Sequence, residues 1–181
     1  SGHGSVLKDI ATSMDLLVES FLDDNPQALF IDGVPVVKSE EIIEFIEKDF
    51  VISIGNNEVR KMISNRLHVN YINLIDRSAI ISSSSQIKLG TVIMKGVCIN
   101  ANVVIGKHVI INTAAVIEHD CIIGDFVHIS PNATITGNIK IGEGVHIGAG
   151  ATLIPNISIG KWATIGAGAV VVKDVPEYAV V

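Results

Sequence analysis

The sequence predicts a small α/β domain over residues 1–70, followed by a parallel β-helix over residues 71–181. Two observations support this division. From Ile75 to Val171, seventeen branched aliphatic residues stand six apart without a break, and fifteen of them are Ile. A period of six fits neither the stripe of a helix nor an alternating strand, whereas it matches one rung of a β-helix. Before Tyr71 this spacing is absent, and short apolar runs alternate with helical patterns.

Each rung of the β-helix is expected to be a short strand followed by a turn, with the aliphatic residue pointing inward. The residue four places later is small or β-branched, as at Ala115, Cys121 and Ala151. Three rungs close one coil, so residues eighteen apart stack at the strand spacing of about 4.8 Å. We expect a small residue or glycine to let the chain round each corner. Glycine often follows the aliphatic residue directly, at Gly106, Gly124, Gly142, Gly148, Gly160 and Gly166.

The α/β domain is predicted to begin with an amphipathic helix over about residues 4–15. A strand then ends at Phe21-Leu22, directly before the acidic pair Asp23-Asp24. Strands that alternate with helices in this way are typical of a small parallel, Rossmann-like sheet. Acidic residues at a strand end accept hydrogen bonds from a sugar or a base, although they also start turns.

The second half of this domain continues the alternation. A short strand is expected near residues 34–37, and Ser39 is placed to cap a helix whose first turn is acidic. Residues 50–54 are predicted to form a buried strand. This strand breaks at Gly55, and a helix that contains Arg60 follows.

The chain opens with Ser1-Gly2-His3-Gly4 and runs directly into the first helix. A glycine-rich turn at a helix start is typical of the first strand-to-helix loop of a nucleotide-binding fold, because glycine lets the backbone approach a phosphate. On this interpretation the turn is native, and we expect the first strand of the sheet to lie outside the given chain. The alternative is a cloning remnant. NAD binding is a weaker competitor, since the full dinucleotide fingerprint is absent.

Composition and charge exclude several classes of function. The net charge of −6 argues against nucleic acid as a main partner, because phosphate binding needs clustered Lys and Arg. The only cysteines, Cys98 and Cys121, form neither a disulfide framework nor a zinc-type spacing. The sequence shows no signal peptide and no apolar run of membrane length, so we expect a cytoplasmic protein without a membrane span.

Five stretches, taken in order, resemble one family. They are Ser1-Gly2-His3-Gly4, Phe21-Leu22-Asp23-Asp24, Ile54-Gly55-Asn56-Asn57-Glu58-Val59-Arg60, Ile111-Asn112-Thr113 and Ile117-Glu118-His119-Asp120. With the six-residue repeat, they resemble the bacterial PglD/NeuD-type acetyltransferases, which act on nucleotide-linked amino sugars or on sialic acid. The resemblance covers nearly the whole chain. It implies a left-handed coil, acetyl-CoA as co-substrate and a homotrimer.

The resemblance also implies roles for single residues. In the α/β domain, the nucleotide sugar would be held by Ser1, Gly2, His3, Asp23, Asp24 and Gly55. In grooves between neighbouring subunits, acetyl-CoA would meet Asn112, His128, Ala149 and Ala167. His119 would be the general base and Asp120 its acidic partner. The family usually has Glu where this chain has Asp120, which raises the question of whether the shorter side chain reaches the ring.

Transfer of an acetyl group from a thioester to an amine needs a proton acceptor, and histidine side chains titrate near about pH 6.5. His119 follows an inward-facing isoleucine by two residues, so its side chain is expected outside the coil. Its neighbours eighteen residues away, Ala101 and Gly137, are small and are expected to leave a notch for substrate. A carboxylate at Glu118 or Asp120 would hold the ring tautomer. The alternative is an ordinary surface histidine.

A second column of residues suits the co-substrate. Ala149 and Ala167 stack eighteen apart on another face and would form a smooth wall for the pantetheine arm. The alternative is that these small residues only ease the packing of the coil. His128 and His146 also stack. For His128 we expect contact with the thioester or with CoA, and for His146 a surface position.

The histidine spacings do not suggest a metal site. In carbonic anhydrases built on the same coil, three histidines gather at a subunit interface, and two of them are close in sequence. Here the gaps from His108 to His119, then to His128 and His146, are eleven, nine and eighteen residues. Because there is no short pair, we expect no bound metal.

The sequence therefore predicts an acetyl-CoA-dependent N-acetyltransferase that acts on a nucleotide-linked amino sugar, preferably a UDP-linked 4-amino-dideoxy sugar. The amine would attack the thioester directly, since neither cysteine has a nearby base in sequence that would make it a covalent nucleophile. Two alternatives stay open. One is O-acetylation of sialic acid or a related glycan. The other is a trimeric β-helix scaffold without catalysis.

Overall fold

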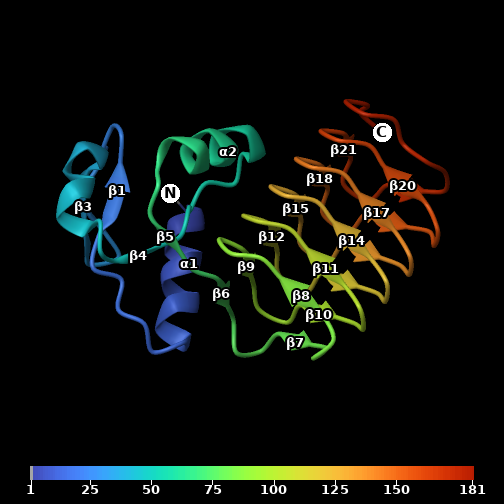
Figure 1. Cartoon of the computed structure of the whole chain (residues 1–181), viewed down its shortest axis with the longest axis horizontal. Coiled ribbons are helices and arrows are strands. Elements are labelled where there is room, and N and C mark those ends of the chain that lie inside the picture. The colour runs from blue at the N-terminus through green and yellow to red at the C-terminus, as the bar shows by residue number, and fades with distance from the viewer. Residues whose placement is uncertain (1) are drawn as a thin grey trace.

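Over most of the chain, a two-residue strand recurs every six residues. These strands together form a long coil (Figure 1). The computed structural model describes residues 2–181. Strands eighteen residues apart pair in parallel, for example Ile99 with Ile117. This register holds from β6 (Leu74–Ile75) to β22 (Val170–Val171), which confirms the predicted period and its stacking.

The strands fall into three parallel sheets, which form the three faces of the coil. The α1-facing sheet, named for helix α1 (Gly2–Ser13), contains β6, β9 (Val92–Ile93), β12 (Ile110–Ile111), β15 (His128–Ile129), β18 (His146–Ile147) and β21 (Thr164–Ile165). The apolar sheet contains β7 (Ile80–Ile81), β10 (Cys98–Ile99), β13 (Val116–Ile117), β16 (Thr134–Ile135), β19 (Thr152–Leu153) and β22. The third sheet contains β8 (Gln86–Ile87), β11 (Val104–Ile105), β14 (Ile122–Ile123), β17 (Lys140–Ile141) and β20 (Ser158–Ile159).

Three corners join these faces, and at each turn from Gly90 to Gly168 one residue takes a positive φ, which Gly, Asn and Asp tolerate best. The small-residue corner joins the α1-facing sheet to the apolar sheet and contains Gly96, Ala114, Asn132, Gly150 and Gly168. The asparagine corner joins the apolar sheet to the third sheet and contains Asn102, Asp120, Asn138 and Asn156. The aromatic corner leads back to the α1-facing sheet and contains Gly90, His108, Phe126, Gly144 and Trp162.

Glycine turns some corners with a positive φ, as at Gly96 and Gly150, but the glycines that directly follow the inward aliphatic residue have no positive φ. The turning residue comes three places after the aliphatic residue, as Asp120 follows Ile117. Gly124 lies instead where two coils approach closely. A Cβ atom at this position would stand 2.7 Å from the backbone nitrogen of Glu143 in the next coil. Contact between coils therefore requires glycine there, rather than an unusual φ.

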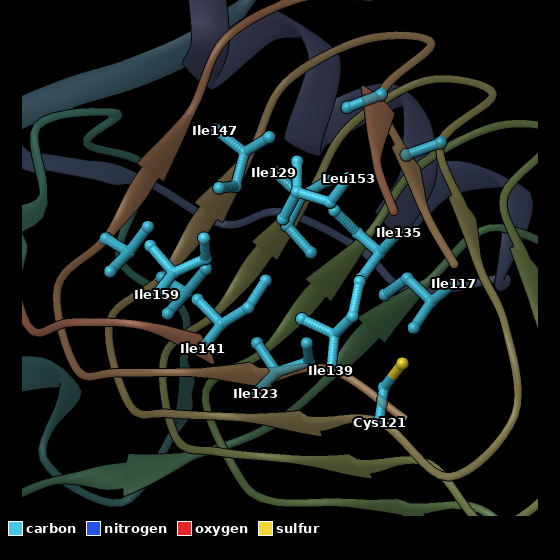
Figure 2. Packing of buried hydrophobic residues seen from close by; sticks show 14 of the residues in the cluster. Ile117, Cys121, Ile123, Ile129, Ile135, Ile139, Ile141, Ile147, Leu153 and Ile159 are labelled. Carbon is cyan, nitrogen blue, oxygen red and sulfur yellow. The ribbon is translucent and has the colours of Figure 1, made fainter. Parts of the chain in front are cut away.

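The inward-facing side chains form one core that runs along the coil (Figure 2). Side chains from all three sheets meet in it, and Ile117, Ile129 and Ile135 have no exposed surface. Cys121 fills one of the small positions and is fully buried, as the sequence predicted. Burying one such isoleucine stabilises the fold by about 1.5–3 kcal/mol relative to leaving it exposed, so the stacked columns hold the coil together.

The N-terminal domain contains, within the described residues, α1, α2 (Asn57–Arg66), a 3₁₀ helix η1 (Ser39–Phe45) and two small sheets. The first sheet pairs β1 (Phe21–Asp23) in parallel with β3 (Val34–Lys38), and β3 antiparallel with β2 (Phe30–Ile31). The second sheet pairs β4 (Asp49–Phe50) with β5 (Asn70–Tyr71) in parallel. The domain is α/β as predicted, but its first sheet is mixed because a tight turn at Gly33 joins β2 to β3.

Three details of this domain differ from the sequence prediction. Helix α1 begins two residues early, at Gly2, because the glycine-rich opening forms its first turn. Residues 51–54 form no strand, since no strand of the described chain pairs with them. Ser39 does not cap η1: Lys38 is the N-cap residue, and the Ser39 hydroxyl donates to Asp24 instead.

A cavity of about 490 Å³ lies beside β1 and residues 49–54. Helix α1 contributes Leu7 to its lining, and α2 contributes Ile63. Most of the lining is apolar. Two edge strands, β1 and β4, line this cavity.

Helix α1 covers the first coils of the α1-facing sheet (Figure 1). Leu7 and Ile10 pack against the outward-facing side chains of Leu74 and Ile110. Beyond this contact the sheet continues with polar outward residues. The predicted domain boundary after residue 70 falls within β5, whose two residues pair with β4 of the N-terminal domain. The exact position of the boundary stays a prediction.

Gly124→Ala should destabilise the coil by about 2–3 kcal/mol, because the added methyl group overlaps the backbone of the next coil. Asn100→Ala is the matched control, since it changes the same position of the repeat on another face, and it should cost less than about 1 kcal/mol. Urea unfolding followed by circular dichroism measures both changes. Equal unfolding midpoints for the two variants would contradict the close-approach interpretation.

Candidate active site

His119 and Asp120 form an exposed pair at the asparagine corner. The His119 Nδ1 atom lies 2.8 Å from Asp120 Oδ2. Because a carboxylate only accepts hydrogen bonds, Nδ1 carries the proton of the neutral ring and Nε2 keeps its lone pair. The shorter side chain of Asp120 therefore reaches the ring. Hydrogen bonds from His119 and from Asn102 lower the pKa of Asp120, so its carboxylate stays charged.

Two residues eighteen positions away shape this pair. Asn102 donates from Nδ2 to Asp120 Oδ1 over 3.1 Å and orients the carboxylate. Gly137 makes room for the imidazole, because a Cβ atom there would lie 2.8 Å from His119 Nε2. The His119 ring thus lies over Gly137, in the space that the sequence suggested as a notch for substrate. Sequence analysis missed Asn102, although counting eighteen residues back from Asp120 would have found it.

The other predicted site residues of the coil lie on the α1-facing sheet or at the small-residue corner. The asparagine corner joins the apolar and third sheets, so in a three-sided coil it lies opposite the α1-facing sheet. His128 begins β15 of the α1-facing sheet, and Asn112 directly follows β12. Ala149 and Ala167 are exposed beside the small-residue corner. One chain therefore does not bring His119 together with these four residues.

His128 has a hydrogen-bond partner at each ring nitrogen. Its Nδ1 atom lies 3.3 Å from the Gly55 carbonyl oxygen, and its Nε2 atom lies 3.3 Å from Asn112 Nδ2. The His146 ring, predicted as a surface residue, stacks on His128 with centroids 5.1 Å apart. Burial, followed by repulsion from His146 and Arg60, lowers the pKa of His128 to about 4. His128 is therefore neutral at physiological pH.

His3 lies in the first turn of α1, close enough to His128 to lower its pKa. The His3 Nε2 atom is buried and has no hydrogen-bond partner among the described residues. Burial and then the charge of Arg60 lower the pKa of His3, which favours a neutral ring. Gly2 starts the same turn and is exposed. Ser1, the remaining residue predicted for this turn, lies outside the described residues.

The acidic pair at the end of β1 is engaged within the domain. Asp23 Oδ1 accepts from the backbone nitrogen of Asn25 over 2.8 Å. The Asp24 carboxylate accepts from two nitrogens of Arg66, at 3.0 and 3.1 Å, and from the Ser39 hydroxyl. These bonds lower the pKa of Asp24. Both aspartates line the cavity beside β1, whereas the first turn of α1, from its second residue on, does not.

Arg60 joins the two parts of the molecule and is only 1% exposed. Its guanidinium donates to the carbonyl oxygens of Ile54 and Gly55, and to those of His108 and Phe126 in the aromatic corner. Burial lowers the pKa of Arg60 to about 10, so the side chain remains protonated. Sequence analysis placed Arg60 on a helix but missed this role, since a position on a helix does not reveal what covers it.

Cys98 and Cys121 are both free thiols. Within residues 2–181, no group of three or more His, Cys, Asp or Glu side chains is arranged to hold a metal ion. Over the same range, no helix is both long enough and apolar enough to cross a membrane.

Comparison with known proteins bears on both parts of the fold. A family profile described as the PglD N-terminal domain matches residues 1–67, and one described as the bacterial transferase hexapeptide matches residues 102–137 and 138–173. PerB from Caulobacter crescentus, solved with CoA and GDP-perosamine, is 34% identical, with a TM-score of 0.93 over 99% of this chain and 89% of that chain. The acetyltransferase domain of PglB from Neisseria gonorrhoeae FA1090, solved with acetyl coenzyme A, is 36% identical, with a TM-score of 0.93 over 99% and 91%.

The chain belongs to the PglD-type family of hexapeptide-repeat acetyltransferases. The resemblance inferred from the sequence is thereby confirmed, and with it the left-handed β-helix. A curated relative, UDP-N-acetylbacillosamine N-acetyltransferase from Bacillus subtilis (strain 168), is 41% identical over 102 residues. That match spans 51% of this chain and 47% of the relative, which is about half the length of each.

Two histidines make the stability of this family member depend on pH. Folding lowers the pKa of His108 and of His128 to about 4, mainly through burial, whereas a histidine in an unfolded chain titrates near about 6.5. Between these values the unfolded chain binds more protons than the native protein. Stability is therefore complete above about pH 6.5 and falls as the pH drops towards about 4.

His108→Asn should make this fall shallower. Asparagine accepts the positive φ of 53° at this corner and does not titrate. Phe126→Leu is the control, because it removes the ring that stacks on His108 but no titrating group. It should lower the melting temperature at every pH and keep the slope. The measurement is the melting temperature of each variant between about pH 7 and about pH 4.5. If the melting temperature of His108→Asn falls with pH as steeply as that of the unaltered protein, His108 does not contribute to the pH dependence.

Proposed function

We propose that this protein is an acetyl-CoA-dependent N-acetyltransferase that modifies the amino group of a nucleotide-linked amino sugar. The His119–Asp120 pair carries this proposal, since it presents a base with a free Nε2 atom on the surface of the family fold. The relatives support the acceptor, because PerB was solved with CoA and GDP-perosamine and the Bacillus relative is named for an amino sugar. A UDP-linked 4-amino-dideoxy sugar is our preferred acceptor. The free thiols suit a reducing cytoplasm, where we place the reaction.

In the proposed reaction, His119 is the general base. The amine nitrogen attacks the thioester carbonyl carbon, and His119 Nε2 accepts the proton that the nitrogen loses. The charge of Asp120 stabilises the imidazolium that forms. The carbon–sulfur bond then breaks, and the proton passes from His119 to the departing thiolate. Burial raises the pKa of the Cys121 thiol, which disfavours a covalent acetyl-enzyme and supports direct transfer.

We infer that a second copy of the chain completes this site. His119 lies at the asparagine corner, whereas His128 lies on the opposite face of the same coil and Asn112 lies where that face meets the small-residue corner. The apolar sheet lies between the asparagine corner and the small-residue corner. Its outward residues carry no charge, and they are Ile80, Cys98, Val116, Thr134, Thr152 and Val170. Ile80 is 71% exposed and Val170 is 65% exposed, so the uncharged face between them is accessible to another subunit.

A homotrimer with the apolar sheet turned towards its threefold axis buries these side chains. In that arrangement the asparagine corner of each subunit meets the small-residue corner of the next. His119 then faces the groove beside Asn112, Ala149 and Ala167 of the neighbouring subunit, where acetyl-CoA would lie. The nucleotide sugar would be held by the N-terminal domain, through Ser1, Gly2, His3, Asp23, Asp24 and Gly55.

His119→Ala should lower kcat at least about 100-fold, because it removes the base. Asp120→Asn should lower kcat about tenfold, since an exposed carboxylate is screened by water and contributes less than a buried one. His68→Asn, which changes an exposed histidine of the N-terminal domain, is the control and should keep full activity. The measurement is CoA thiol release with acetyl-CoA and UDP-, GDP- or CMP-linked amino sugars, or free sialic acid.

The outcomes of this panel separate the candidate functions. Release that depends on His119 and on a nucleotide-linked amino sugar supports the proposal. Release only with sialic acid would indicate O-acetylation, and no release with any acceptor would favour a scaffold. Full activity of His119→Ala would rule out His119 as the base.

Mixed trimers test whether the site is shared. His119→Ala and Asn112→Ala should each be nearly inactive alone. When the two variants are co-expressed in equal amounts, a site with both residues intact forms at about a quarter of the interfaces, so about a quarter of the unaltered activity should return. A site built within one chain would give no recovery. The recovered activity is read from the same thiol assay on tag-purified mixed trimers.

A further inference from the structure

Arg60 uses all five of its N–H donors to join the N-terminal domain to the coil. Nε donates to His108 O over 2.8 Å, and Nη2 donates to Phe126 O over 2.8 Å. Nη1 donates to Ile54 O over 3.0 Å and to Gly55 O over 3.1 Å. The fifth donor goes to the side chain of a neighbouring asparagine on α2. All of these acceptors are neutral oxygens. The guanidinium therefore holds them by directional hydrogen bonds rather than by an ion pair.

The Gly55 carbonyl that Arg60 holds is also the partner of His128. A carbonyl oxygen only accepts hydrogen bonds, so His128 Nδ1, 3.3 Å away, must carry a proton. On the other side of the ring, Asn112 Oδ1 accepts from the backbone nitrogen of Thr113 over 2.8 Å. That contact turns Asn112 Nδ2 towards His128 Nε2, which must therefore offer a lone pair. Both neighbours select the same neutral tautomer, with hydrogen on Nδ1.

This tautomer determines what His128 and Asn112 contribute to a bound thioester. His128 Nε2 has no hydrogen, so it cannot donate to the thioester oxygen or protonate the leaving thiolate. Asn112 Nδ2 has two hydrogens, and one of them points to His128. Among the described residues, no acceptor takes the second hydrogen. Asn112 is thus the side chain in this pair that can donate to the oxygen of the thioester as negative charge develops on it.

We propose that Arg60 is a positioning residue for acetyl transfer: by fixing the Gly55 carbonyl, it sets the His128 tautomer and so aims the Asn112 amide at the thioester oxygen. This inference rests on the proposed function. The two contacts of His128, at 3.3 Å each, have room to shorten when substrates bind. Arg60 does not touch either substrate in this arrangement. It acts through the loop and the imidazole.

The charged surroundings of His128 support the neutral ring. His146 stacks on it from β18, Arg60 approaches from α2, and His3 faces it from α1. Burial is the largest cause of its low pKa of about 4, and each of these three groups lowers it further. The Gly55 carbonyl acts in the opposite direction but is outweighed. If Nε2 were protonated as well, its N–H and the N–H of Asn112 Nδ2 would face each other as two donors without an acceptor.

The first test is the tautomer itself, in substrate-free protein labelled with ¹⁵N at histidine. Long-range ¹H–¹⁵N correlation spectra at neutral pH should show His128 with a protonated Nδ1 and an unprotonated Nε2, and the His128→Gln spectrum assigns the signals. In Arg60→Lys, the Nε2-protonated form should appear, because lysine cannot hold several carbonyl oxygens in a fixed fork. A protonated Nε2 in the unaltered protein would overturn the proposal, and this result does not depend on whether Arg60→Lys folds.

The second test is kinetic and has a matched control on the same helix. Arg60→Lys should lower kcat about tenfold, with KM for acetyl-CoA changed less than about twofold, because the oxyanion donor is misaligned rather than removed. Lys61 also joins α2 to the coil, through Glu143 and the Trp162 ring, but it does not contact Gly55. Lys61→Met should therefore keep kcat and the His128 tautomer even if it lowers the melting temperature.

The outcomes distinguish this inference from the proposed function. Equal losses of kcat in Arg60→Lys and Lys61→Met would reduce Arg60 to a structural clamp and overturn the inference. Unchanged kcat and tautomer in Arg60→Lys would do the same. Failure of the proposed function appears elsewhere, as acetyl transfer that survives His119→Ala or as no transfer at all, whatever the tautomer of His128.

Discussion

The backbone hydrogen bonds that hold successive coils in a register of eighteen residues are the constraint on which the rest of this structure depends. Asn112 N donates to Ile129 O over 2.9 Å, and the same bond recurs rung after rung along the coil. Each outward side chain is therefore fixed directly above one neighbour and below another. A large residue fits only where its column allows, as the Trp162 ring lies against Gly144 and the His119 ring against Gly137. The size of the side chain that fits at a position thus depends on the residues eighteen places before and after it, rather than on its neighbours along the chain.

The same constraint keeps His119 apart from the other predicted site residues of the coil within one chain. Three flat faces of two-residue strands leave little room for a concave pocket, and the register keeps each face distinct. A base on the asparagine corner is held away from the α1-facing sheet for the whole length of the coil. Concave space arises where two coils meet along their corners. In the trimer that we propose, catalysis would be tied to assembly, since the apolar sheet lies between the two corners that would share the substrates.

The coil and the His119–Asp120 pair could be predicted because a repeat converts sequence spacing into spatial distance. Counting by eighteen placed Gly137 beside His119 correctly, and it would have found Asn102 as well. The N-terminal domain has no such rule. Residues 51–54 have strand-forming composition, but a strand also needs a partner, and none of the described chain supplies one. Ser39 has the composition of a cap, yet Asp24 takes its hydroxyl. The burial of Arg60 depends on carbonyl groups 48 and 66 residues away, which no local pattern reveals.

The junction between the domain and the coil combines an apolar contact with a directional one, and the two differ in what they fix. The packing of Leu7 and Ile10 on the coil supplies stability but tolerates small shifts, because apolar contact has little directional preference. The hydrogen bonds of Arg60 are directional, and they converge on the loop that contacts His128. Acetyl transfer needs its acceptor and its thioester aligned to within fractions of an ångström. The coil has no long loops that could adjust to an acceptor, so in our proposal alignment comes from the N-terminal domain, which would hold the sugar. The buried guanidinium of Arg60 would then transmit the position of that domain to the face of the coil where the thioester would lie.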